Sequence, residues 1–352
     1  MLSICLSMFP KPVPAGISDA EFRRMVTDFS EVGGTFPFDN VVSNELPFQQ
    51  PIPTVRRTIQ PGGVYLGVGP EQNFTYIAAF EPSIAFIIDI RRQNMLEHLL
   101  YRAVFELAED RADFVSMLFC RKRPTGLGAE PPVASLFRAF KSVKPDRELF
   151  DHNLKVITDV LVKTHQFPLT SDDIATIARV YERFFIGGPT LDYGIEVGRG
   201  TGTPTYEALM NATDQLGHNW SYLANESRYQ KIRRMEQRNL IVPITGDFAG
   251  RTTLQQVGRY LDDQRMIVSV FYASNVEQYL FRRDDWSHFY ENVEALPLNS
   301  SSTFIRSVTS NEISGITNMG FASVQGSISQ TIKAFHDGRI GKYHDIVEMS
   351  FR

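Results

Sequence analysis

Two glycines and two aspartates in this sequence have the spacing that a nucleotide-binding site requires. Gly67 and Gly69 stand between an apolar segment and a helical one. Glycine at these positions permits a sharp turn and leaves the main chain open to a ligand. The helix that follows offers its first N–H groups to that ligand. Asp89 ends the next apolar segment, at the distance of one strand-turn-helix-strand unit, and Asp247 ends a later one. We expect Asp89 to accept hydrogen bonds from ribose hydroxyls and Asp247 to accept one from an adenine amino group.

Each of these residues also has a simpler structural interpretation. Glycines between a strand and a helix often form only a tight turn, and an aspartate at a strand end is commonly a cap or turn residue. The dinucleotide fingerprint would place its third glycine at position 72, where the chain has Gln72. A side chain there keeps the helix away from the strand, which favours a single nucleoside-like ligand over NAD or FAD.

The elements that would position these groups follow from the apolar periodicity. We expect an α/β fold, a doubly wound and mostly parallel sheet, because short apolar segments alternate with helical ones. Strands are predicted at 63–66, 84–90, 239–247, 266–272, 303–308 and 345–351, and helices at 19–29, 95–107, 154–161, 170–181, 254–260 and 284–295. Ligands of such sheets bind outside the carboxyl ends of the strands, where the glycine turn and both aspartates would lie together.

The chain divides into three predicted parts. Residues 1–60 form an N-terminal extension, and its segment 33–45 either lies across the mouth of the site or caps the sheet as a surface loop. Residues 61–352 form the Rossmann-like domain. Residues from about 125 to 235 contain little that is typical of strands, and we interpret them as a helical insertion that selects the substrate or forms a lid.

Composition narrows the classes of function. The chain has 352 residues, a formal charge of -4 and 43% hydrophobic residues, so we expect a globular protein that is not a general nucleic-acid binder. Two cysteines far apart and scattered histidines, His98 and His165 among them, have no metal-ligand spacing, so we expect no metal site and helix-surface roles for the histidines. No apolar run is long enough to span a membrane. The apolar residues 1–9 make a poor signal peptide, which favours a cytoplasmic protein.

Four stretches carry a resemblance to a known fold family: GVYLGVGPEQNFTYI, NLIVPITGDFAG, FYASNVEQYLF and SSTFIRS. They are similar to an uncharacterised bacterial family that resembles the class I S-adenosylmethionine-dependent methyltransferases, over roughly residues 30–120 and 205–310. The resemblance implies S-adenosylmethionine as cofactor and a methyltransferase of unknown substrate. By this resemblance Gly67, Gly69, Asp89 and Asp247 map onto cofactor-contacting positions. Glu71 and Asn73 of the same turn are further candidate cofactor-binding residues.

The chain departs from the family pattern at two positions of the turn. The motif begins with an acidic residue two places before its first glycine, where this chain has Tyr65. Glu71 replaces the usual third glycine, and its carboxylate either compensates for the missing acid or repels the carboxylate of the cofactor. The two departures favour an alternative, a non-catalytic binding or regulatory protein on the same scaffold. An NAD-linked oxidoreductase is a third and weaker alternative.

On the substrate side, the candidates come from two segments. Asn275 and Tyr272, at the end of the strand 266–272, are the candidate catalytic residues, although an Asx turn explains Asn275 equally well. Asp39, Asn44 and Glu45 are predicted to approach from the N-terminal loop. Arg306 either meets an anionic substrate or forms a surface salt bridge.

Overall fold

One six-stranded sheet organises the part of the chain that the computed structural model describes, residues 15–193, 203–309 and 320–350. The strand order is β3-β2-β1-β4-β5-β6; neighbours are parallel except β6, which runs antiparallel to β5. The strands are β1 Val64–Gly67, β2 Ile84–Asp89, β3 Ile241–Thr245, β4 Val268–Ser274, β5 Thr303–Thr309 and β6 Phe321–Ser327. The predicted α/β class with a mostly parallel sheet is therefore confirmed. Strands β2 and β3 follow on one side of β1 and strands β4, β5 and β6 on the other, so the strand order changes direction between β1 and β4.

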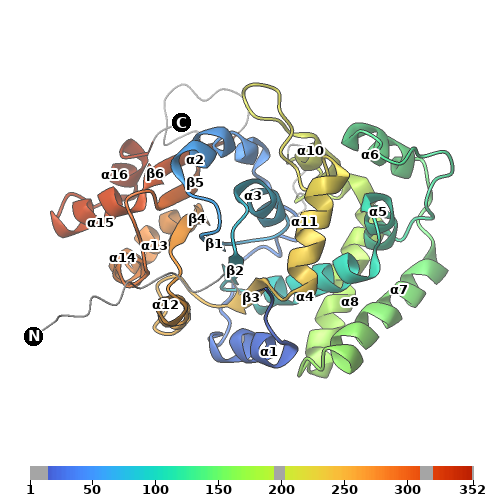
Figure 1. The fold of residues 1–352 in the computed structure, drawn as a ribbon, viewed down its shortest axis with the longest axis horizontal. Helices are drawn as coiled ribbons and strands as arrows, with labels where there is room; N and C mark the ends of the chain where they lie inside the picture. The colour runs from blue at the N-terminus through green and yellow to red at the C-terminus, as the bar shows by residue number, and fades with distance from the viewer. Residues whose placement is uncertain (1–14, 194–202, 310–319, 351–352) are drawn as a thin grey trace, which may run out of the picture.

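Helices cover both faces of this sheet (Figure 1). In that view α12, α13 and α14 lie to the left of the sheet, and α3, α4 and α11 lie to its right. All residues of β1, β2 and β3 are buried, which explains their nearly continuous apolar sequence. The helices are α1 Asp19–Asp28, α2 Ile52–Thr58, α3 Gln72–Phe80, α4 Arg92–Leu107, α5 Arg111–Phe119, α6 Val133–Lys141, α7 Arg147–Asp159, α8 Ser171–Gly187, α10 Tyr206–Asn211, α11 Glu226–Gln237, α12 Thr253–Gln264, α13 Val276–Arg283, α14 Trp286–Glu294, α15 Ile328–His336 and α16 Tyr343–Glu348.

Between β2 and β3 the described residues form helices and no strand of the sheet. In Figure 1, α5, α6, α7 and α8 lie beyond α11, away from the strands. Contacts of α4 with β2, β3, α8 and α11 join this group to the sheet. A capping box begins α8, since Asp173 N–H donates to Thr170 Oγ1 at 3.1 Å and Thr170 N–H donates to Asp173 Oδ2 at 2.9 Å. The substrate-selecting or lid role of this segment stays a prediction.

The prediction of a last strand at residues 345–351 was wrong. Residues 343–348 form α16, whose buried residues Tyr343, Ile346 and Val347 repeat at helical spacing. Asp345 accepts the main-chain N–H groups of Gly341 and Lys342 and so caps its first turn. The sixth strand is β6, which sequence analysis missed because its polar and small residues lack an alternating apolar pattern. It pairs with β5 along its whole length.

The salt bridge expected for Arg306 is present, but it is buried and does not lie at the surface. The Arg306 side chain is 1% exposed, inside the packing of β5 against α13. Arg306 Nη2 donates to Glu277 Oε1 at 3.1 Å, and Tyr290 donates to the same oxygen at 2.7 Å. The guanidinium is therefore part of a buried ion pair, neither at the surface nor near a ligand.

None of the helices in the described part of the chain is long and apolar enough to cross a bilayer. The apolar residues 1–9 lie outside the described residues.

Candidate functional site

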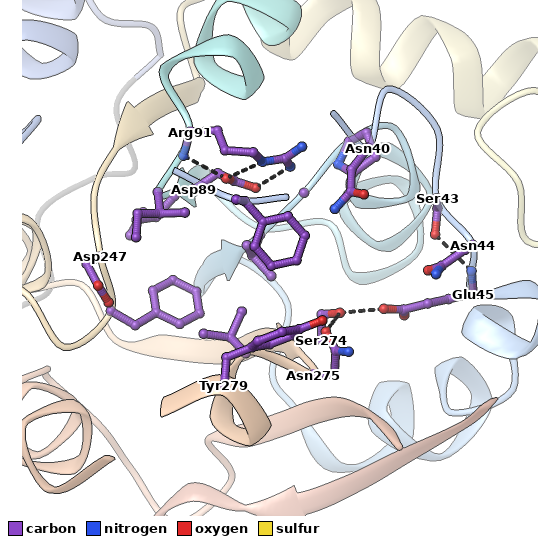
Figure 2. A pocket seen from close by; sticks show the side chains of 18 of the residues that line it. Asn40, Ser43, Asn44, Glu45, Asp89, Arg91, Asp247, Ser274, Asn275 and Tyr279 are labelled. Carbon is purple, nitrogen blue, oxygen red and sulfur yellow. Dashed lines mark hydrogen bonds and ion pairs between the residues drawn. The ribbon is translucent and has the colours of Figure 1, made fainter. Parts of the chain in front are cut away.

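A cavity of about 370 Å³ opens at the carboxyl ends of β1 to β4 (Figure 2). Its walls are the glycine turn after β1, the tips of β2 and β3, the start of α13, and the N-terminal segment 35–45. Because it lies where the sheet order changes direction, it occupies the usual ligand position of a doubly wound sheet. Of the sequence-predicted residues, Gly69, Asp89, Asp247, Asn44, Glu45 and Asn275 line this cavity.

The glycine turn is held from inside the protein. Gly69 lines the cavity with φ +81°, a conformation that favours glycine. The Asn73 side chain donates to the carbonyl oxygens of Val68, Gly69 and Pro70 at 2.8–3.0 Å. A Cβ on Gly67 would lie 2.1 Å from Asn73 Oδ1. The predicted cofactor contacts of Gly67 and Asn73 were therefore misplaced: both lie behind the turn, outside the cavity lining.

Two further side chains behind the turn explain its departure from the family motif. Tyr65, which stands at the acidic position, is 1% exposed and donates its hydroxyl hydrogen to Asn73 Oδ1 at 2.8 Å. Glu71 is fully buried, accepts from Ser43 N–H at 3.3 Å, and does not line the cavity. Burial raises the pKa of Glu71 to about 8, so this carboxyl is mostly neutral at pH 7. Glu71 was wrongly placed among ligand contacts, and neither side chain fills the cavity.

His98 on α4 is a positioning residue that sequence analysis assigned to a helix surface. It is 2% exposed, and its Nε2 lies 2.9 Å from the carbonyl oxygen of Gly69. Burial lowers the pKa of His98 to about 4, so the ring is neutral at pH 7. Since a carbonyl only accepts hydrogen bonds, Nε2 carries the hydrogen. His98 therefore orients the main chain of the turn.

Asp89 is the most strongly engaged carboxylate in the cavity wall. Arg91, two residues later, donates its main-chain N–H and its Nε to Oδ1, both at 2.9 Å, and its Nη2 to Oδ2 at 2.8 Å. The two side chains are 6% and 8% exposed. Figure 2 shows the contacts between them. Asp89 lies in the cavity wall where the sequence predicted it, and it is already paired with Arg91.

Asp247 after β3 has a similar arrangement at a more exposed place. Its Oδ2 accepts from Arg283 Nη2 at 2.7 Å, and its Oδ1 accepts from Ala249 N–H at 3.0 Å. Arg283 also pairs with Asp285 at 3.1 Å, and Asp285 does not line the cavity. Asp89 and Asp247 thus face one cavity, each beside its own arginine.

The N-terminal segment 35–45 forms one wall of the cavity, and its place across the mouth of the site stays a prediction. Arg91 Nη1 donates to the main-chain carbonyls of Phe38 and Asp39, which ties the segment to the tip of β2. Phe36 packs edge-on against Tyr279 of α13, with ring centroids 5.3 Å apart. The Asp39 side chain does not line the cavity, so its predicted contact with substrate was wrong. Asp39 contributes its main-chain carbonyl, which accepts from Arg91.

Glu45 connects this segment to the end of β4. Tyr272 donates to Glu45 Oε2 at 2.6 Å, and Ser274 donates to Glu45 Oε1 (Figure 2 shows the Ser274 contact). Gln72 Nε2 donates to the Tyr272 hydroxyl at 3.2 Å. Burial raises the pKa of Glu45, against the opposing effect of three hydroxyl groups, those of Ser274, Tyr272 and Ser307. Tyr272 does not line the cavity, so it supports Glu45 instead of meeting substrate as predicted, whereas Asn275 does line it.

Several lining residues had no signal in the sequence. The apolar wall comes from aromatic side chains on four separate segments, Phe36, Tyr193, Phe248 and Tyr279. Gln72, Arg91 and Arg283 also line the cavity. Arg91 could have been found from its position two residues after Asp89, and Gln72 from its place in the glycine turn. In the described ranges, no group of three or more His, Cys, Asp or Glu side chains could hold a metal ion.

The sequence profile of one protein family covers most of the residues that line this cavity. It is described as a domain of unknown function (DUF7790), and it matches residues 40–125 and 192–347, well over half of the chain. The chain belongs to that family. The match includes the glycine turn and all six strands, and it leaves out α6, α7 and α8. Among curated proteins, none matches this chain.

Proposed function

We propose that this protein binds S-adenosylmethionine in the cavity at the carboxyl ends of β1 to β4 and is a methyltransferase with a class I type of Rossmann fold. One observation carries the proposal: the turn at Gly69 and the carboxylates of Asp89 and Asp247 line a single cavity beside the change of strand order. That is where a sheet of this type offers main-chain groups and acceptors to an adenosine.

The residues present suit such a ligand. A carboxylate accepts about four hydrogen bonds. Arg91 donates three to Asp89, which leaves Oδ2 able to accept from a ribose hydroxyl. Asp247 could accept from an adenine amino group in the same way. The aromatic rings of Phe36 and Tyr279 suit both an adenine base and a cationic sulfonium group. When bound, the cofactor would supply an electrophilic methyl group.

The methyl transfer itself depends mainly on placement. An in-line displacement at a methyl group needs a nucleophile held in contact and in line, and such orientation contributes about 7–11 kcal/mol in well-aligned cases. The wall beside the end of β4, with Glu45, Ser274 and Asn275, is the side from which a nucleophile would approach.

A non-catalytic binding protein on the same scaffold is the second candidate. The observation that favours it is that Asp89 and Asp247 already have arginine partners and that Tyr65 replaces the acidic residue of the motif. An NAD-linked oxidoreductase is less compatible, because the Gln72 side chain lies where a dinucleotide would need the third glycine.

Calorimetric titration with S-adenosylmethionine, S-adenosylhomocysteine and NAD tests the proposal. The variant Asp247→Asn removes a carboxylate that lines the cavity, and Asp285→Asn removes the other carboxylate paired with Arg283, outside the lining. We expect the wild type to bind the two adenosyl ligands and not NAD. Asp247→Asn should bind about tenfold more weakly or worse, the value of a hydrogen bond to a charged group, and Asp285→Asn should match the wild type.

Three results would separate the candidates. If only NAD binds, the oxidoreductase is correct. If all three ligands fail, the site does not bind S-adenosylmethionine and the proposal is wrong. If the adenosyl ligands bind but no methyl group reaches any acceptor in a radiolabelled methyl-transfer screen of cell extract, the non-catalytic candidate is preferred.

A further inference from the structure

Glu45 stands out among the charged groups of the cavity. The acids Asp89 and Asp247 are each paired with an arginine. Glu45 is 3% exposed, lines the cavity, and has no salt bridge to any residue of the described chain. Its two oxygens accept from the hydroxyls of Tyr272 and Ser274, and the Ser307 hydroxyl is a further neutral partner. The wall beside β4 therefore presents one carboxylate whose charge is not balanced by a cation.

A second acceptor lies next to it. Ionised Glu45 must receive the hydrogen of the Tyr272 hydroxyl, so the Tyr272 oxygen is left to accept from the Gln72 amide nitrogen. The Gln72 side chain therefore turns its amide nitrogen toward Tyr272 and its carbonyl oxygen away from it. Its carbonyl oxygen is buried and has no hydrogen-bond partner, although Gln72 lines the cavity and is 3% exposed. A buried acceptor without a partner has lost its hydration without compensation, and a ligand donor would supply the missing hydrogen bond.

The two acceptors together indicate the chemistry of the substrate. Both Glu45 and Gln72 contact the same Tyr272 hydroxyl, so they lie close together in the wall. A hydroxyl group carries one hydrogen to donate, whereas an amino group carries at least two. An anionic substrate would meet an unbalanced carboxylate and be repelled. The wall thus suits a neutral or cationic ligand that bears an amino group.

We propose that Glu45 is the general base for methylation of an amino group, with the Gln72 carbonyl as the second acceptor of that group; this inference rests on the function proposed above. In the step, the lone pair of the neutral amine forms the new N–C bond. The C–S bond of the sulfonium breaks, and its electron pair stays on sulfur. The surplus N–H proton passes to Glu45. The raised pKa of Glu45 makes this carboxylate a stronger proton acceptor than an exposed glutamate.

A pair of cofactor analogues tests the inference without knowledge of the substrate. Sinefungin has an amino-bearing carbon where S-adenosylmethionine has its methylated sulfur, and S-adenosylhomocysteine has no group there. The readout is the ratio of the two dissociation constants, measured by calorimetry. We expect the wild type to prefer sinefungin by about tenfold or more, because its ammonium group donates to Glu45 and Gln72. In Glu45→Gln the preference should fall to about twofold or less.

Glu71→Gln is the matched control. Glu71 is a buried carboxyl beside Glu45, but it lies outside the cavity lining and is mostly neutral at pH 7. This variant should keep the wild-type preference, and melting temperatures verify that both variants are folded.

Each result has a distinct meaning. If the wild type binds both analogues equally, the inference is wrong while the proposed cofactor site stands. If Glu71→Gln loses the preference as Glu45→Gln does, the assignment to Glu45 is also wrong. If the wild type binds neither analogue, the proposed function fails, and the inference fails with it.

Discussion

The ion pair between Asp89 and Arg91 permits a quantitative prediction. Both side chains are less than one-tenth exposed, so neither charge is well solvated. Removing one partner of a buried pair costs about 3–5 kcal/mol, because the remaining charge is left without compensation. When the carboxylate is lost, Arg91 keeps the carbonyls of Phe38 and Asp39 as acceptors and the weaker Coulombic attraction of Glu97. We therefore expect Asp89→Asn to lower the free energy of unfolding by about 3 kcal/mol.

The double variant Asp89→Asn/Arg91→Met isolates the pair. It removes both charges, so its cost should be smaller than the sum of the two single variants by about 2 kcal/mol or more. Arg91→Met should also release segment 35–45, since Arg91 ties this segment to β2. Urea unfolding followed by circular dichroism measures the free energies, and hydrogen exchange of residues 35–45 measures the release.

The control for this cycle is Asp39→Asn. Arg91 contacts the carbonyl of Asp39 and not its side chain, so the control should stay within about 0.5 kcal/mol of the wild type. A cost below about 1 kcal/mol for Asp89→Asn would refute the reasoning, because the pair would then behave like an exposed one. Strict additivity in the cycle would refute it as well. The same result decides whether Asp89 variants can be used to study ligand binding.

Three further predictions concern the surrounding structure. Arg306→Met should lower the free energy of unfolding in urea by about 3–5 kcal/mol, because it leaves the buried Glu277 carboxylate without its cation. Adding Glu277→Leu should restore most of this loss. No restoration would contradict the ion-pair argument. Hydrogen bonding to Arg92 lowers the pKa of Asp173 to about 2, so its stabilisation is present above pH 3.8 and disappears as the pH falls toward 2. Asp173→Asn should lower the free energy of unfolding by about 1–2 kcal/mol at pH 6, a modest value because the arginine is half exposed. This difference from the wild type should shrink as the pH falls from 3.8 toward 2. A difference that does not change with pH would contradict the pairing of Asp173 with Arg92. Gly67→Ala should lower the melting temperature and weaken ligand binding, because its Cβ would overlap the Asn73 amide that holds the turn; unchanged stability would show that the turn tolerates the extra carbon.

Local sequence patterns were sufficient to predict most strands of the sheet. Strands β1 to β5 lie within a few residues of their predicted positions, because buried parallel strands are short apolar runs bounded by turn residues. The pattern failed at β6, whose residues are small and polar, and at α16, where a helical spacing over six residues was too short to be distinguished from a strand. Helix α13 was not predicted either, since the helix predicted in this region began at residue 284.

The candidate site was predicted in part, for a similar reason. Asp89 and Asp247 line the cavity because the ends of parallel strands meet at one edge of a sheet, a consequence of the strand positions alone. Gly67, Glu71 and Asn73 belong to the same turn as Gly69, yet they face the interior. Position within a turn does not reveal on which side of the main chain a side chain lies.

The sequence by itself determined where strands end and which groups stand at those ends, because periodicity and turn chemistry act between near neighbours. The tertiary structure alone decided which of those groups are already paired and which remain available. Glu45 meets Tyr272, 227 residues away, and His98 meets the carbonyl of Gly69 across two elements. Such contacts depend on how separate elements pack, and the same packing sets the burial that shifts each pKa.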